Sequence, residues 1–156
     1  MFRLLLTLAF VAVGACQASP ALGSPRQTFS IQTTGVLTSE TSASGTFTTS
    51  GAVLDAGLYT ETFRLVGNTI HAVKTLEGAN GSLVVAITGV VENPTASTVS
   101  FRAGHWRIVS ATGDFAGLHG GGSPGSSGLA DLTAGTVQFA HEGAVIVRRP
   151  DAPQRQ

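Results

Sequence analysis

The fold class is decided by residues 58–91, LYTETFRLVGNTIHAVKTLEGANGSLVVAITGVV. Apolar and polar side chains alternate through much of this stretch, which is the pattern of strands with one buried face. The pairs Gly67-Asn68 and Asn80-Gly81 interrupt the alternation, and such pairs form tight turns because they tolerate positive φ. The stretch therefore predicts hairpin-connected strands at 58–66, 69–78 and 82–91.

The same signals continue on both sides of this stretch. Thr, Val and Ile are dense, Gly recurs every few residues, and no stretch of twelve residues carries a helical apolar stripe. Residues 114–134 are the one long irregular piece, with a short helical turn expected at 114–118. The remaining predicted strands are 28–38, 44–54, 98–102, 104–111 and 135–147, which brings the total to eight.

Eight antiparallel strands with short turns fit either a sandwich or a closed barrel. Only 12% of the residues are charged, so few charges are available to protect an exposed edge strand from pairing with another chain. A closed barrel has no edge strand. We therefore predict an all-β fold, a single antiparallel eight-stranded closed barrel over residues 28–147.

Residues 1–15 have the composition of an export signal. Arg3 gives a positively charged start, and residues 4–13 form an uncharged apolar run. This run has the length of a signal-peptide core and is too short to span a bilayer. The sequence therefore predicts an exported, extracytoplasmic protein with a signal peptide over residues 1–15.

The apolar run ends in Val13-Gly14-Ala15-Cys16, which resembles the bacterial lipobox, where cleavage precedes a cysteine that receives lipid. We expect a lipid-anchored bacterial protein modified at Cys16, with the membrane contacted only through that anchor. Ordinary cleavage after Ala15 or Ala18, which gives a secreted protein, remains the alternative. Residues 16–27 form a predicted flexible tether, and residues 148–156 a predicted disordered tail.

Composition and motifs exclude several functions. Nine basic and nine acidic residues balance, whereas a nucleic-acid surface needs a clustered excess of Lys and Arg. The single cysteine excludes an intrachain disulfide and a thiolate metal site. Residues 121–125, GGSPG, match the Gly-x-Ser-x-Gly string of serine hydrolases, but Pro124 has no N–H for an oxyanion hole. The four histidines lack metal-ligand spacing, so we expect no metal and no cofactor.

Residues 104–120, GHWRIVSATGDFAGLHG, resemble the signature of the dirigent and allene oxide cyclase-like barrels and of their bacterial secreted relatives. The resemblance implies an eight-stranded antiparallel barrel, often a homo-oligomer, with a central apolar cavity. Characterised relatives cyclise small hydrophobic molecules, or guide their coupling, without a redox cofactor. The motif also has a structural interpretation, in which Phe115 and Leu118 plug one mouth of the barrel and Trp106 fills space.

Strand parity selects the candidate site. Tyr59, Glu61 and Phe63 share one face of strand 58–66, and Phe139 and His141 share the apolar face of strand 135–147. If these faces point inward, Glu61 and His141 are ionisable groups inside the barrel and become the candidate acid–base pair. The candidate ligand-binding residues are Tyr59, Phe63, Trp106 and Phe139.

Two features leave this assignment open. A bulge at Gly143 would reset the parity of the last strand, and Glu61 would be a solvated charge if it lay at the rim. Three functions follow: an exported barrel that binds a small apolar molecule, a structural or adhesive module, and a cofactor-free cyclase or isomerase that acts on a small hydrophobic substrate in the cavity.

Overall fold

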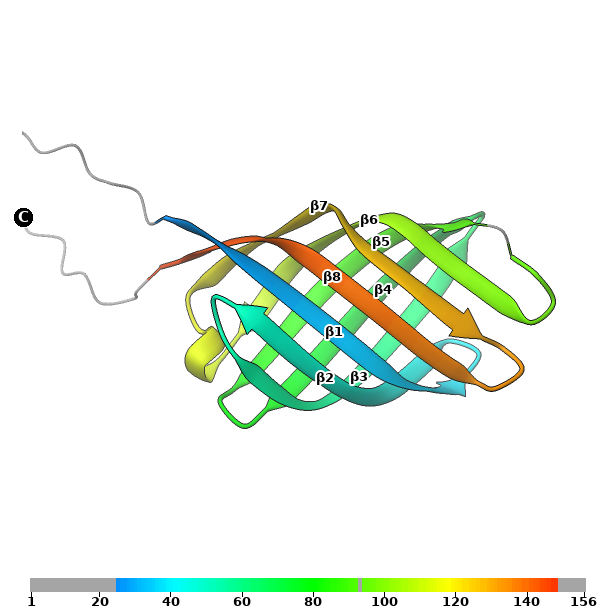
Figure 1. The fold of residues 1–156 in the computed structure, drawn as a ribbon, viewed down its shortest axis with the longest axis horizontal. Helices are drawn as coiled ribbons and strands as arrows, with labels where there is room; N and C mark the ends of the chain where they lie inside the picture. Colours follow the sequence, from blue (N-terminus) through cyan, green and yellow to red (C-terminus); the bar gives the residue numbers. More distant parts are fainter. Residues whose placement is uncertain (1–24, 93, 149–156) are drawn as a thin grey trace, which may run out of the picture.

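Eight antiparallel strands follow one another in chain order around a closed barrel, and β8 completes it by pairing with β1 (Figure 1). The structure is a computed structural model that describes residues 25–92 and 94–148. Closure satisfies the backbone donors and acceptors that an open sheet would leave at its edges. The predicted all-β fold and the eight-stranded closed barrel are confirmed.

The strands have the alternation and the turns that the sequence predicts. Gly67 and Gly81 have φ values of 63° and 149°, which accounts for the tight turns at these positions. Residues 113–115 form the short helical turn expected near Asp114. The elements are β1 (Arg26–Ser39), β2 (Ser42–Gly51), β3 (Asp55–Val66), β4 (Thr69–Gly78), β5 (Ser82–Glu92), β6 (Thr98–Ala111), η1 (Gly113–Phe115), β7 (Leu118–Asp131) and β8 (Thr136–Val147).

Two strand predictions were wrong in the last part of the barrel. The predicted strands 98–102 and 104–111 are one strand, β6, and most of the predicted irregular segment 114–134 is strand β7. Ladder irregularities around Gly104, and between Gly121 and Ser126, explain why local alternation fails there. The glycine-rich β7 has weak strand propensity, but its backbone must bond to β6 and β8 if the barrel is to close.

The predicted signal peptide, residues 1–15, and the predicted lipidation site, Cys16, lie outside the described residues. So does the predicted tail beyond Arg148. Strand β1 begins at Arg26, so the predicted tether over 16–27 is two residues too long at its end. Within the described part of the chain, no helix has the length and apolarity needed to cross a membrane.

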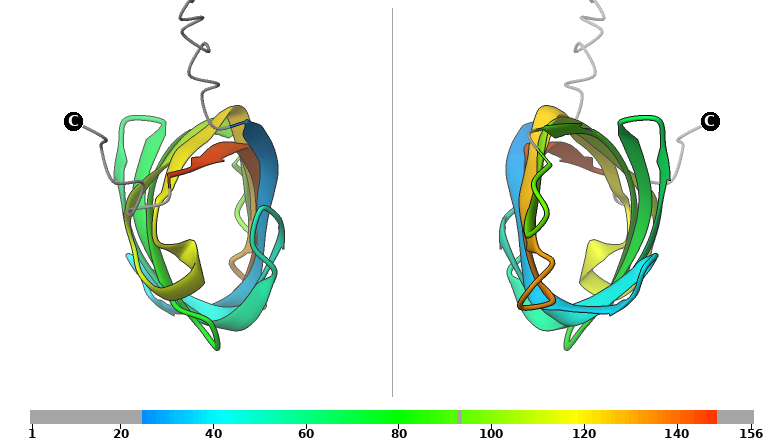
Figure 2. Two further views of the ribbon diagram at one scale, coloured as in Figure 1. Left: turned by 90° about the vertical axis from the view of Figure 1, so that its left-hand side faces the viewer. Right: turned by 90° about the vertical axis from the view of Figure 1, so that its right-hand side faces the viewer.

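The two ends of the barrel differ. The η1 end carries η1, the start of β1 and the end of β8, while the far end carries the turns between β1 and β2, β3 and β4, and β7 and β8 (Figure 1). Figure 2 shows η1 folded across the opening at its end. Phe115 of η1 has an exposed fraction of 0%, and Leu118 just after it has 2%. The predicted plug of one mouth is therefore confirmed.

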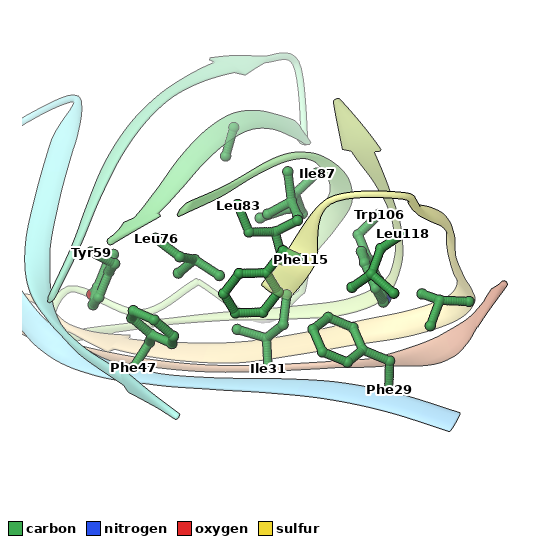
Figure 3. Packing of buried hydrophobic residues seen from close by; sticks show 13 residues of the cluster. Phe29, Ile31, Phe47, Tyr59, Leu76, Leu83, Ile87, Trp106, Phe115 and Leu118 are labelled. Carbon is green, nitrogen blue, oxygen red and sulfur yellow. The ribbon is translucent and has the colours of Figure 1, made fainter. Parts of the chain in front are cut away.

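Side chains fill the half of the barrel next to η1. Trp106 packs in this cluster as predicted, with its ring centroid 6.1 Å from that of Phe29. Its indole Nε1 donates a hydrogen bond of 2.9 Å to the Glu142 carbonyl oxygen, which satisfies the only polar atom of the side chain. Figure 3 shows the cluster, which comprises Phe29, Ile31, Phe47, Tyr59, Ala72, Leu76, Leu83, Val85, Ile87, Trp106, Phe115, Leu118 and Val145.

The Tyr59 ring points inward by strand alternation, and Gly35 leaves the space for its hydroxyl. Gly35 pairs with Gly45 across β1 and β2, and Gly45 pairs with Tyr59 across β2 and β3. A Cβ atom at Gly35 would lie 2.7 Å from the Tyr59 hydroxyl oxygen, so the phenol ring fits only because a side chain is missing there. Glu61, two residues further along β3, faces the same side of the strand as Tyr59.

If Phe115 closes the η1 end, Phe115→Ala should lower the free energy of unfolding by about 3–5 kcal/mol, because it leaves a cavity in a filled half of the barrel. Urea denaturation of the mature domain measures this loss. Leu54→Ala is the matched control, since Leu54 lies in a loop at the same end and is 72% exposed; its effect should stay within about 0.5 kcal/mol. Equal losses in the two variants would contradict the plug.

Candidate functional site

Five polar side chains meet inside the barrel, between the apolar cluster near η1 and the far end. Glu61 and Lys74 are cross-strand partners on β3 and β4, and His141 of β8 pairs with Ser126 of β7. Thr33 of β1 completes the group through Lys74. We call these residues the lumenal cluster: Thr33, Glu61, Lys74, Ser126 and His141.

Lys74 lies at the centre of the lumenal cluster. Its side chain has an exposed fraction of 0%, and it is the only lysine in the sequence. The Nζ atom donates hydrogen bonds to Thr33 Oγ1 at 2.9 Å and to His141 Nε2 at 3.1 Å, and it lies 3.5 Å from Glu61 Oε2. The strands thus supply two hydrogen-bond acceptors and one counter-ion from three directions, which is what a buried ammonium needs.

Two aromatic rings complete the surroundings of the ammonium. Lys74 Nζ lies 4.4 Å from the ring centroid of Phe139 and 5.0 Å from that of Tyr59. The faces of aromatic rings attract cations, and this attraction is stronger away from water. Two of the four predicted ligand-binding residues therefore contact the cation of the cluster.

The contacts of Lys74 fix the tautomer of His141. Because the ammonium can only donate, His141 Nε2 must accept, and the ring proton then resides on Nδ1. Nδ1 lies 2.8 Å from Ser126 Oγ and donates to it. The Ser126 hydroxyl consequently keeps its own hydrogen free to donate elsewhere.

Glu61 and Tyr59 each carry a polar atom without a hydrogen-bond partner among the described residues. Glu61 Oε2 is buried, and its 3.5 Å approach to Lys74 is an ion pair without hydrogen-bond geometry. The Tyr59 hydroxyl is buried as well. Unsatisfied buried acceptors are rare and costly, and they concentrate at functional sites.

Burial shifts the pKa of every titratable member of this region. It lowers the pKa of Lys74 to about 8, against the opposing effect of the Glu61 carboxylate. It raises the pKa of Glu61, which Lys74 partly offsets. It lowers the pKa of His141 well below its usual value, and the Lys74 charge acts in the same direction. Burial, together with Glu61, raises the pKa of Tyr59 to about 12. His141 is therefore neutral at pH 7.

A cavity of about 20 Å³ adjoins the lumenal cluster on the side of the far end. This is room for about one water molecule. The resemblance of residues 104–120 implies a central apolar cavity, but side chains fill most of the described lumen. The cavity is lined by Glu61, Ile70, Ala72, Ile87, Gly89, Phe101, Gly104, Ser126, Ser127, Phe139 and His141.

The structure brings most of the predicted site residues together. Glu61 and His141 are 3% and 1% exposed and share Lys74 as a partner, so the rim position considered for Glu61 is wrong. The ladder between β1 and β8 runs through Gly143 without a shift, so the bulge considered there is also absent from that pairing. Phe63 and Phe139 are partly buried toward the far end, whereas Trp106 packs in the other half of the lumen.

Sequence reasoning missed three members of the lumenal cluster. Lys74 shares the inward face of β4 with Ile70, Ala72 and Leu76, so the parity argument that selected Glu61 applies equally to Lys74. Thr33 carried no signal, because a threonine is ordinary on either face of a strand. Ser126 follows the irregularity after Gly121, where parity carries no information.

The described residues hold no group of three or more His, Cys, Asp or Glu side chains that could bind a metal ion. His141 has both ring nitrogens occupied by hydrogen-bond partners, so it offers no free ligand atom in this arrangement. The carboxyl, hydroxyl, imidazole and amine groups of the lumenal cluster can transfer protons and form hydrogen bonds.

The ion pair can be tested by removing one partner and then both. Lys74→Met removes the cation that opposes the raised pKa of Glu61, so this pKa should rise further and the free energy of unfolding of the variant should fall as the pH is raised from 5 to 8. Adding Glu61→Leu should remove most of that fall, since no carboxylate then remains in the lumen. Denaturant unfolding of the two variants measures both values, with the exposed Glu142→Gln as the control. A double variant less stable than Lys74→Met would contradict the pairing.

The pKa of Lys74 predicts a pH dependence of stability. Between about pH 8 and the ordinary lysine value of 10.5, the unfolded chain binds more protons than the folded one, so stability should rise with pH in this window, by up to roughly 3 kcal/mol. Tyr59 acts in the opposite sense between pH 10 and about 12, because its folded pKa is the higher one. Urea midpoints from pH 7.5 to 10 should therefore increase for the natural protein. They should not increase for the Glu61→Leu/Lys74→Met double variant, and parallel curves would contradict the burial of a charged Lys74.

Comparisons with models of protein families, with curated proteins and with solved structures yield no match to this chain. The resemblance of residues 104–120 to the dirigent and allene oxide cyclase-like barrels therefore stays a sequence-based hypothesis. The functional argument rests on the geometry of the lumenal cluster and its cavity.

Proposed function

We propose that the protein is an exported β-barrel that transfers protons within a small, mostly apolar carbonyl compound bound at the far half of its lumen, without a cofactor. This is the isomerase-type alternative suggested by the family resemblance. Export rests on the signal-like residues 1–15, and attachment to a membrane rests on lipid at Cys16.

One observation carries the proposal: a serine and a glutamate line the same small cavity. The donor is the Ser126 hydroxyl, whose hydrogen is left free by the tautomer of His141. The acceptor is the Glu61 carboxylate, whose Oε2 lies 3.5 Å from Lys74 Nζ and accepts no hydrogen bond within the described residues. A carbonyl compound needs this combination, a donor for its oxygen and an acceptor for the proton on the adjacent carbon.

Glu61 and Ser126 act directly on the substrate in this scheme. Glu61 removes the proton from the carbon next to the carbonyl group, and its raised pKa makes it a better base than an ordinary carboxylate. Ser126 donates to the carbonyl oxygen, where negative charge develops. Returning the proton to a different carbon completes an isomerisation, with no atom lost or gained.

Lys74 and His141 are positioning residues in this scheme. Lys74 lies behind Glu61 and His141, and its ammonium holds the carboxylate by charge and the imidazole by a hydrogen bond. His141 in turn holds Ser126. The electrostatic field at the cavity is therefore organised before any substrate arrives, which is the condition for efficient stabilisation of a charged transition state.

Aromatic side chains at the far end form the entrance. Phe63, Phe101 and Phe139 are partly buried, and the rings of Phe101 and Phe139 lie 5.7 Å apart. A substrate larger than one water molecule enters by displacing one of these rings, and its apolar body then occupies the space of that ring. This arrangement selects small molecules with apolar bodies.

The same geometry bears on the two other functions considered. A purely structural barrel gains no stability from Lys74, because apolar side chains of similar volume stabilise a core at least as well as a buried ion pair. Binding of a small apolar molecule without turnover uses the same entrance and the same Ser126 donor, and it is the second candidate. Activity on the carbonyl compound separates the two.

The proposal is tested by following exchange of the protons next to a carbonyl group for deuterium in D₂O, using ¹H NMR and cyclohexanone with related small ketones. The natural protein should accelerate exchange over buffer. Glu61→Gln should lower this acceleration by about a hundredfold or more, because it removes the base. Ser126→Ala should lower it by about tenfold or more, because it removes the donor.

Glu142→Gln is the matched control, because Glu142 follows His141 on β8 but is exposed on the outer face, and it should exchange at the natural rate. Phe101→Ala widens the entrance and removes the size limit on the probe. Stabilisation of the protein by ketones without any exchange would favour binding without turnover. No exchange by either the natural protein or Phe101→Ala would overturn the proposal.

A further inference from the structure

A second site lies on the opposite side of the barrel wall from the lumenal cluster. A groove of about 660 Å³ runs over the outer face of β3, β4, β5 and β6. Figure 1 shows these four strands side by side along the barrel. The groove volume falls within the range of small-molecule sites, about 300–1,000 Å³, and it far exceeds the lumenal cavity.

Four basic side chains line this groove, which we call the basic groove: Arg64, His71, His105 and Arg107. Strand register aligns them, because Arg64 pairs with His71, His71 with Thr88, and Thr88 with His105. At a strand spacing of about 4.8 Å, this row spans about 14 Å across the wall. Arg107 lies two residues beyond His105 on the same face of β6, about 7 Å along the strand.

No acidic residue lines the basic groove. Within the described part of the chain, the ion pairs are Lys74–Glu61 and Arg102–Glu92, so neither Arg64 nor Arg107 has a carboxylate within 4.0 Å. The whole sequence has no net charge and only 12% charged residues. The concentration of basic groups in one hollow is therefore a local feature and does not follow from composition.

The floor between the basic groups is made of small, uncharged side chains. Val73 pairs with Ala86, and Ala86 pairs with Arg107, so the floor lies directly beside the Arg107 row. Ala86 and Thr88 are partly buried, and Val73 is 47% exposed. Such a floor can cover an apolar or aromatic body, whereas the arginines can pair with a charged group.

We propose that the basic groove binds a small organic oxyanion, with the charged group held by Arg107 beside His105 and the uncharged body lying on Ala86, Val73 and Thr88 in the direction of Arg64. The planar guanidinium groups suit phosphate, sulfate or carboxylate oxygens, which they bind through two parallel hydrogen bonds. A bare inorganic anion would leave most of the groove empty. This site is separate from the lumenal cluster and does not depend on the function proposed for it.

The test uses phenyl phosphate as the probe, titrated at low ionic strength into the ¹⁵N-labelled mature protein. Amide signals of β3 to β6 should shift with saturation, and the indole signal of Trp106, the only tryptophan, reports the wall between His105 and Arg107. Benzoate and phenyl sulfate distinguish which oxyanion is preferred. Inorganic phosphate should bind more weakly than phenyl phosphate, and phenol should not shift these signals.

Arg107→Gln should weaken phenyl phosphate binding by about tenfold, the usual effect of removing a charged hydrogen-bond donor, and Arg64→Gln, at the other side of the groove, should weaken it less. Arg102→Gln is the matched control, because Arg102 is also on β6 and is 75% exposed but lies outside the groove; it should leave binding within about twofold. Equal binding by all three variants would overturn the proposal. Saturable shifts with phenol, or no shifts with any of the three organic anions, would also overturn it.

Discussion

Burial of one ammonium group inside a closed barrel is the constraint on which the lumen depends. The cost of removing the Lys74 charge from water is met only if its hydrogens find acceptors and its charge finds a counter-ion. Thr33, His141 and Glu61 supply these from β1, β8 and β3, so the contacts of one side chain tie together strands from both halves of the sequence. The register around the barrel must then be correct, since a slip of one residue would turn Lys74 outward and leave its partners buried alone.

The difference between local signals and barrel closure explains which parts of the fold the sequence could predict. The hairpins from β3 to β5 follow from local alternation and from the turns at Gly67 and Gly81, and these features act within a few residues. Strand β7 does not follow from any local property, because residues 119–128 are mostly Gly and Ser and have no apolar face. It becomes a strand because β6 and β8 present unpaired backbone groups on either side of it. Closure is a property of the whole barrel, and a short window of sequence does not contain it.

Local sequence likewise predicts only some residues of the candidate site. Glu61 and His141 were found because each interrupts an apolar face of a regular strand, and Lys74 could have been found in this way. Ser126 could not, because its inward contact depends on how many residues the irregularity after Gly121 inserts. The tautomer of His141 also cannot be predicted from the sequence, because it depends on the Lys74 ammonium that reaches Nε2 across the lumen. Chemistry that depends on the direction of a hydrogen bond requires coordinates.

The two ends of the barrel give the lumenal cluster different surroundings on its two sides. Near η1, Phe115 and Leu118 seal a half in which large apolar side chains leave no space beside the cluster. Toward the far end, smaller residues such as Ala72, Gly89 and Gly104 line a cavity of about 20 Å³ that Glu61 and Ser126 also line. A barrel filled equally at both ends would bury these groups without access, and one open at both ends would hydrate them and return their pKa values toward normal. In the proposed function, the sealed end keeps the carboxylate desolvated, and a small molecule reaches it from the end lined by partly buried aromatic rings.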